Sequence, residues 1–157
     1  MFRIAKYEDI EEISKLRVIQ QKDDWKELYP NKDEEFYRIT KNYLEDHLNK
    51  DIFFFIEIID NRIVSTCGLQ VIRYMPQCVE SGIEGYICDV FTLKEYRKRG
   101  IQTNLIRECI KFAKKNRIIE LKLSSDNLEA IRIYQGQGFE YDELIMKREI
   151  KEEEVDE

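Results

Sequence analysis

The sequence predicts a mixed α/β fold built around one sheet. Apolar runs with strand character alternate with segments in which apolar residues recur every three or four positions, and turn residues separate the two kinds of segment. With 157 residues, 43% of them hydrophobic, the chain is long enough for one domain with one packed core. Two prolines, six glycines and the lack of an internal repeat argue against a disordered or repetitive chain.

The first half of the chain is expected to supply a strand, two helices and a hairpin. Ile10, Ile13 and Leu16 recur at helical spacing. The expected elements are, in order, a strand over 2–5, helices over 9–20 and 33–48, and strands over 53–59 and 63–74. Asp60-Asn61-Arg62 predicts the turn of the hairpin. The polar segment 22–31, which contains Pro30, predicts a break between the helices.

The second half begins with an expected loop over 75–82. The expected elements that follow are a strand over 83–92, a helix over 101–115, a strand over 118–124, a short helix from about 127 and a terminal strand over 139–150. The predicted order is therefore β-α-α-β-β-β-α-β-α-β.

A basic glycine turn lies between the strand over 83–92 and the helix over 101–115. A helix start presents unpaired N–H groups and about half a positive charge. Gly100 has access to backbone angles closed to other residues, and Arg97, Lys98 and Arg99 add positive charge beside it. Together these features predict a binding site for a pyrophosphate. The alternative interpretation is a solvated surface turn.

A second segment supports the anion-binding interpretation. Asn127 is placed to cap a short helix, and Ala130 and Tyr134 lie on one face of it. Gly136 or Gly138 is suited to ending that helix before Phe139.

The two segments together resemble the GNAT superfamily of N-acetyltransferases. The family signature [Arg/Gln]-x-x-Gly-x-[Gly/Ala] is matched at Arg97 and Gly100. The later signature Asn-x-x-Ala-x-x-x-Tyr-x-x-x-Gly-Phe is matched at Asn127, Ala130, Tyr134, Gly138 and Phe139. The resemblance implies a sheet that splays open between its fourth and fifth strands, where the arm of acetyl-CoA lies. It also implies an acetyltransferase domain over 1–150, followed by an acidic tail over 151–157.

The resemblance carries over a set of cofactor-binding positions. They are Val90, Phe91, Thr92, Arg97, Lys98, Arg99, Gly100, Ile101, Gln102, Thr103 and Asn127. The backbone of 90–92 is expected to pair with the pantetheine amides as an added strand would, and the N–H groups of 99–102 are expected to hold the pyrophosphate. Position 102 departs from the signature, because glutamine replaces a small residue. We expect its side chain to point outward while its N–H stays available.

Acetyl transfer to an amine also needs proton transfers. Tyr134 is expected to donate a hydrogen bond or proton to the leaving thiolate, with packing between helix and sheet as the alternative. Asp89, or Glu84 on the same strand, is a candidate base or amine-binding group, with a structural carboxylate as the alternative. Cys88 is interpreted as a core residue rather than a nucleophile.

Composition excludes several other classes of protein. The net charge of −6 disfavours a nucleic-acid-binding protein. The chain start lacks a signal-peptide pattern, and no apolar run is long enough to span a membrane. One histidine and four scattered cysteines make a metal site unlikely to form, and reduced thiols fit a cytoplasmic protein.

The sequence therefore predicts an acetyl-CoA-dependent N-acetyltransferase that works by direct transfer. The acceptor is an amine of a small molecule, peptide or protein. The walls of its pocket are expected from residues 20–50 and from the loop 74–82; Trp25, Tyr29 and Phe36 are candidates for these walls, with partial core packing as the default interpretation. A non-catalytic acyl-CoA sensor and a nucleotide-phosphate binder are the alternatives. An exposed edge of the last strand would allow a homodimer.

Overall fold

A computed structural model describes residues 1–24, 31–78, 80–142 and 144–149. Five strands form one sheet in the order β1-β2-β3-β4-β5. The first three pairings are antiparallel, and β4 and β5 are parallel. The strands are β1 (Phe2–Ile4), β2 (Ile52–Ile59), β3 (Arg62–Arg73), β4 (Ile83–Thr92) and β5 (Glu120–Lys122). The helices are α1 (Ile10–Asp24), α2 (Asp33–His47), α3 (Ile101–Lys115) and α4 (Leu128–Gly136), with short 3-10 turns η1 (Tyr7–Asp9) and η2 (Lys94–Tyr96).

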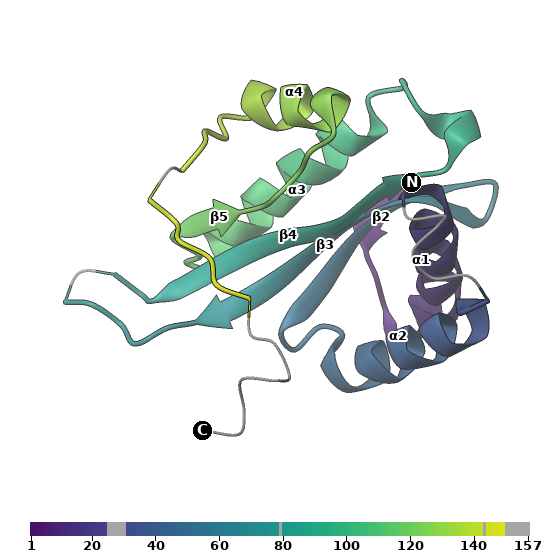
Figure 1. Cartoon of the computed structure of the whole chain (residues 1–157), viewed down its shortest axis with the longest axis horizontal. Coiled ribbons are helices and arrows are strands. Elements are labelled where there is room, and N and C mark those ends of the chain that lie inside the picture. Colours follow the sequence, from purple (N-terminus) through teal and green to yellow (C-terminus); the bar gives the residue numbers. More distant parts are fainter. Residues whose placement is uncertain (25–30, 79, 143, 150–157) are drawn as a thin grey trace.

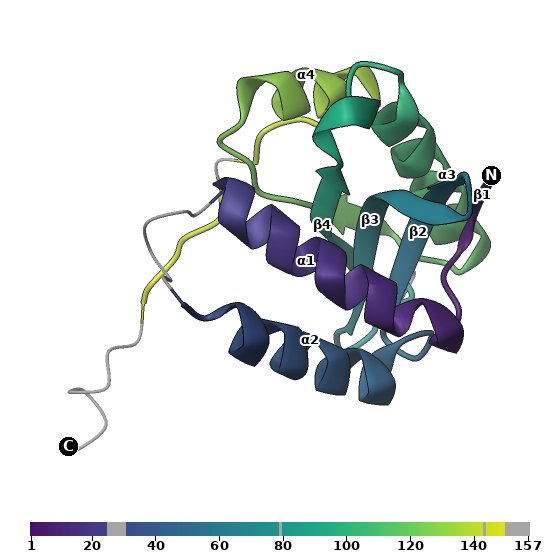
Figure 2. The same ribbon diagram turned by 90° about the vertical axis from the view of Figure 1, so that its right-hand side faces the viewer.

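The helices cover both faces of the sheet. Helices α1 and α2 lie on one face, and α3 and α4 lie on the other (Figures 1 and 2). Each face has its own apolar cluster. Leu16, Leu44 and Phe54 belong to the α1–α2 side, and Leu105 and Tyr134 belong to the α3–α4 side. The sheet is thus buried on both sides, which fixes its strands as a platform for the connecting turns.

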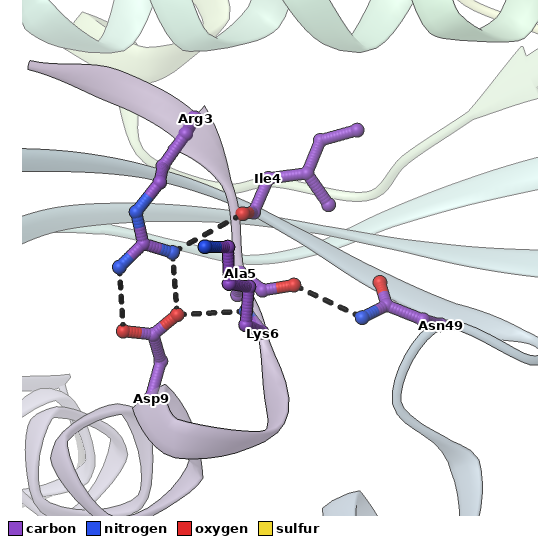
Figure 3. Close-up of polar contacts among 6 residues, drawn as sticks. All are labelled: Arg3, Ile4, Ala5, Lys6, Asp9 and Asn49. Carbon is purple, nitrogen blue, oxygen red and sulfur yellow. Dashed lines mark hydrogen bonds and ion pairs between the residues drawn. The ribbon is translucent and has the colours of Figure 1, made fainter.

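A buried ion pair sets the direction in which α1 leaves β1. The guanidinium of Arg3 donates two hydrogen bonds to the Asp9 carboxylate, at 2.6 and 2.9 Å, and the Lys6 N–H donates a third at 2.7 Å (Figure 3). Asn49 adds a hydrogen bond to the Ala5 carbonyl at 3.0 Å. Such a bidentate pair is geometrically specific, so it holds the start of the helix whose later turns carry functional side chains.

Strand β4 has an irregular backbone where it faces the middle of β3. The register shifts between Thr66 and Gly68, so that Asp89 and Val90 together oppose Cys67. Asp89 has a positive φ of 48°. This arrangement is a β-bulge, which bends a strand and redirects its side chains.

The pairing of β4 with β5 is short. It runs from Glu84 opposite Glu120 to Tyr86 opposite Lys122 and then stops. Beyond Tyr86, the β5-facing edge of β4 has no strand partner within the described ranges. This agrees with the expected opening between the fourth and fifth strands.

The predicted fold class is confirmed, and most expected elements are present. The strand over 83–92 and the helix over 101–115 match to the residue. The first helix is longer than expected and reaches Asp24, while the strand expected over 118–124 contains three residues. No helix in the described ranges is long and apolar enough to cross a membrane.

The predicted terminal strand over 139–150 is wrong for the residues that the structure describes. Residues 139–142 and 144–149 form no strand, and Leu144 and Met146 are 90% and 97% exposed. Alternating apolar residues favour a strand only if a sheet edge receives them, and the sequence pattern does not specify that edge. The boundary expected between 150 and 151 lies outside the described residues and stays a prediction.

Candidate functional site

The turn from β4 into α3 forms an open helix start. Gly100 precedes the helix with φ 74° and ψ 5°, the left-handed region that favours glycine. The first α-helical hydrogen bond runs from the Asn104 N–H to the Gly100 carbonyl at 3.1 Å. The N–H groups of Ile101, Gln102 and Thr103 therefore have no acceptor within the helix. A Cβ added at Gly100 would meet no atom within 4 Å, so the space beside this backbone is open.

Two of the three basic side chains support the turn. Arg97 donates to the Thr92 carbonyl at 2.8 Å and to Asp23 at 3.2 Å, and its guanidinium lies 5.6 Å from the centre of the Phe91 ring. Asp23 also pairs with Lys94 at 3.2 Å. The end of α1 is thereby attached to the basic turn.

Arg99 and Lys98 differ in their contacts. Arg99 donates to the Glu95 carbonyl at 2.8 Å and stacks 5.2 Å from the Tyr96 ring centre. Lys98 is exposed, has a positive φ of 62°, and forms no ion pair with a described residue. Arg97 and Arg99 thus shape the turn while adding positive charge, and the Lys98 ammonium stays available to an anion.

Gln102 points inward, so the expectation of an outward side chain is wrong. Its Nε2 lies 2.8 Å from the Phe91 carbonyl and 3.1 Å from the Thr66 carbonyl, with the Ser65 and Thr92 hydroxyls both at 2.9 Å. These oxygens lie near the start of β3 and the end of β4, and the two amide hydrogens can donate to two of them, which a small residue cannot do. The backbone N–H of Gln102 is still in the first turn of α3.

Asp89 and Val90, the two residues of the bulge, point to opposite sides of the sheet. Val90 packs with the α3–α4 cluster. Asp89 instead faces α1, where its Oδ1 accepts a hydrogen bond from Arg17 Nε at 2.8 Å. The backbone of Val90, Phe91 and Thr92 follows the bulge in the part of β4 that β5 does not reach.

Arg17 was not predicted as a site residue. Besides Asp89, its guanidinium donates to the Thr40 hydroxyl at 3.1 Å and lies 5.0 Å from the Phe36 ring centre. Its side chain is 27% exposed and that of Asp89 is 21% exposed. The Arg17–Asp89 ion pair joins α1 to the bulge. If Asp89 binds or deprotonates an amine, one of its carboxylate oxygens is already hydrogen-bonded to Arg17.

A cavity of about 570 Å³ lies beside this ion pair. Its walls include Arg17 and Asp24 from α1, Phe36 and Ile39 from α2, and Asp89 from β4. The expected contribution of Phe36 to a pocket is therefore seen. Trp25 and Tyr29 lie outside the described residues, and residues 74–78 and 80–82 do not line this cavity.

Tyr134 and Asn127 occupy α4 as expected from their spacing. Tyr134 is 7% exposed and packs edge-on against Phe139, with ring centres 6.0 Å apart. Burial raises the pKa of Tyr134 to about 12, so the phenol keeps its proton at neutral pH. Asn127 caps the helix: its Oδ1 accepts hydrogen bonds from the N–H groups of Glu129 and Ala130.

Other candidate groups have structural surroundings. Burial raises the pKa of the Cys88 thiol, and the neighbouring Asp89 charge adds to the effect, which disfavours a nucleophilic thiolate. Glu84 pairs with Lys122 at 2.7 Å, on the paired part of β4. All four cysteines are free. Within the described ranges, no group of three or more metal-ligating side chains is placed to hold an ion.

The family model of the acetyltransferase (GNAT) family matches residues 18–139, and the chain belongs to this family. The protein is therefore an N-acetyltransferase by class, as the motifs predicted. An N-alpha-acetyltransferase of Saccharolobus solfataricus is 27% identical over 146 residues, which cover 87% of this chain and 78% of the relative.

Solved structures show the same fold. A predicted acetyltransferase from Clostridium acetobutylicum, solved with acetyl-CoA, superposes with a TM-score of 0.78 at 24% identity and covers 95% of both chains. A GCN5-related N-acetyltransferase from Ralstonia eutropha also has a TM-score of 0.78, at 17% identity, and covers 96% of this chain and 97% of its own.

Proposed function

We propose that the protein transfers the acetyl group of acetyl-CoA directly to an amine while both substrates are bound. The observation that carries this proposal is the open start of α3, with Gly100 in the left-handed region, directly beside the unpaired part of β4. The helix start offers N–H groups to a pyrophosphate, and the free edge of β4 offers backbone groups to the pantetheine amides. The cofactor would thus run from the basic turn along β4 toward Asp89.

Pyrophosphate binding is assigned to the N–H groups of residues 99–102, with Thr103 in the same turn. Lys98 supplies charge to the phosphates, while Arg97 and Arg99 hold the turn in shape. Val90, Phe91 and Thr92 pair with the arm through their backbone. One N–H near the bulge is placed to polarise the thioester carbonyl.

Proton transfer completes the proposed reaction. An amine of pKa about 10.4 is neutral at pH 7 only at a cost of roughly 4.6 kcal/mol, so removal of its proton to Asp89 or to water helps the attack. The nitrogen then bonds to the acetyl carbon as the carbon–sulfur bond breaks. Tyr134 retains a proton that it can share with the departing thiolate, and Asn127 is assigned to the pantetheine end of the site.

The reaction is tested by measuring free thiol released from acetyl-CoA in the presence of an amine panel. Turnover that depends on the amine, together with an acetylated product in mass spectrometry, supports the proposal. Binding of acetyl-CoA without turnover on any amine would favour a sensor of the same fold. Equal affinities for ADP and CoA in calorimetry would contradict the pantetheine contacts. A cytoplasmic location stays a prediction. A homodimer also stays a prediction, but the described residues of 139–150 do not form the strand whose edge was expected to pair.

A further inference from the structure

The cavity beside Asp89 has one long wall from a single face of α1. Arg17, Gln20, Gln21 and Asp24 line it, and their spacing of three, four and seven residues places them along one side of the helix. Helices α1 and α2 run next to each other over the sheet in Figure 2. The cavity thus extends from the bulge of β4, at Arg17, to the last turn of α1, at Asp24.

Most charges of this cavity are paired with each other. Arg17 is bound to Asp89 at 2.8 Å, and Lys32 is bound to Glu35 at 2.6 Å. Asp24 lines the same cavity but forms no ion pair with any residue that the structure describes. Among the described residues that line the cavity, the charge left without an ion pair is therefore the Asp24 carboxylate, at the end away from Asp89, and a negative charge there favours a cationic group.

The surroundings of Asp24 add to this preference for a cation. Desolvation raises the pKa of the Asp24 carboxyl, and the nearby carboxylates of Asp23 and Asp126 contribute in the same direction, whereas a hydrogen bond with Gln20 and the charge of Arg97 act against them. A bound cation would offset the net rise, because an opposite charge stabilises the ionised carboxylate.

An apolar wall lies across from α1. Phe36 and Ile39 come from one face of α2, and Ile39 is 48% exposed although it is a large aliphatic residue. A methylene chain packed against Phe36 and Ile39 would cover this surface. The distance along α1 from Arg17 to Asp24 is seven residues, or roughly 10 Å at 1.5 Å per residue.

We propose that the acceptor is a linear di- or polyamine. Its reacting nitrogen lies at Asp89, its methylene chain packs on Phe36 and Ile39, and a second, protonated nitrogen binds Asp24. This assignment rests on the proposed function, because it takes the acetyl group to arrive at the bulge of β4. The neutral nitrogen receives the acetyl group and loses its proton, while the distal ammonium keeps its charge.

The test compares two acceptors of equal chain length. Thiol release is measured at saturating acetyl-CoA with hexamethylenediamine and with hexylamine, which lacks the second nitrogen, and with a short peptide that carries a free α-amine. We expect kcat/KM for the diamine to exceed that for hexylamine by about fivefold, the effect of a partly exposed charge pair of about 1 kcal/mol, beyond the statistical advantage of two equivalent nitrogens.

A matched pair of variants identifies the carboxylate. Asp24→Asn should reduce the ratio of the two kcat/KM values by about fivefold. Asp46→Asn makes the same change of charge at an exposed position of α2 outside the cavity, and it should leave the ratio within about twofold. Melting temperatures of both variants establish that they are folded.

Three results would overturn the assignment: equal kcat/KM for the two amines, a preference for the peptide over the diamine, or an unchanged ratio in Asp24→Asn. Absence of thiol release with any acceptor would contradict the proposed function itself, and the assignment would fall with it.

Discussion

Replacing Gln102 with alanine should destabilise the protein without removing its cofactor site. The Gln102 amide has two hydrogens, so it can donate to two of the four oxygens within 3.1 Å of its nitrogen. Each such hydrogen bond contributes about 1 kcal/mol net, and the one methylene that alanine lacks adds up to about 0.8 kcal/mol of burial. Gln102 Oε1 is buried without a partner among the described residues, which offsets about 1 kcal/mol.

The sum is a loss of about 2 kcal/mol in the free energy of unfolding, or a decrease of about 4–8 °C in melting temperature for a domain of this size. Circular dichroism during heating and urea titration measure it. Gln102→Glu should cost more, because a carboxylate would face the Thr66 and Phe91 carbonyls. CoA affinity in Gln102→Ala should stay within about threefold, since the backbone N–H remains. A melting temperature within about 1 °C of the parent would refute the role assigned to the amide.

Three further predictions concern single residues. Tyr134→Phe should lower kcat at least about tenfold with little change in CoA affinity. Because the pKa of Tyr134 is about 12, the parent should keep its kcat through pH 10, where an ordinary phenol loses its proton, and a decline of kcat there would contradict the assigned role of Tyr134. Gly100→Ala should cost about 1 kcal/mol in unfolding free energy from its left-handed φ alone. Gly100→Glu should also weaken CoA binding measured by calorimetry, and an unchanged CoA affinity would contradict the proposed pyrophosphate site. Asp9→Asn should lower the free energy of unfolding at neutral pH. Because Arg3 holds the pKa of Asp9 below its usual range, the stabilisation by Asp9 is present above about pH 4 and is lost as pH falls through the lower pKa of the folded state. A stability difference between parent and variant that persists in strong acid would argue against this role.

Local patterns in the sequence were sufficient to predict the turn between β4 and α3. The apolar run of β4, the glycine and the amphipathic run of α3 are adjacent in the chain, and each has a strong preference of its own. Their boundaries were therefore predicted to the residue. Asn127 as a helix cap follows from the same kind of local rule.

Long-range contacts could not be predicted in this way. Arg17 and Asp89 are 72 residues apart, and only the packing of α1 on the sheet brings them together. The inward turn of Gln102 depends on four oxygens from two other segments. The terminal strand was predicted from alternation alone, and alternation carries no information about which edge is available.

The short pairing of β4 with β5 gives the protein an internal reporter of occupancy. Backbone amides past Tyr86 that point toward the missing neighbour have no partner in β5, so in the free protein they should exchange with deuterium readily. A bound arm that accepts hydrogen bonds from them would slow this exchange and leave the amides directed at β3 unaffected. The exchange rates of alternate amides in β4 would thereby show, without any assay of turnover, whether the cofactor arm is bound along this edge.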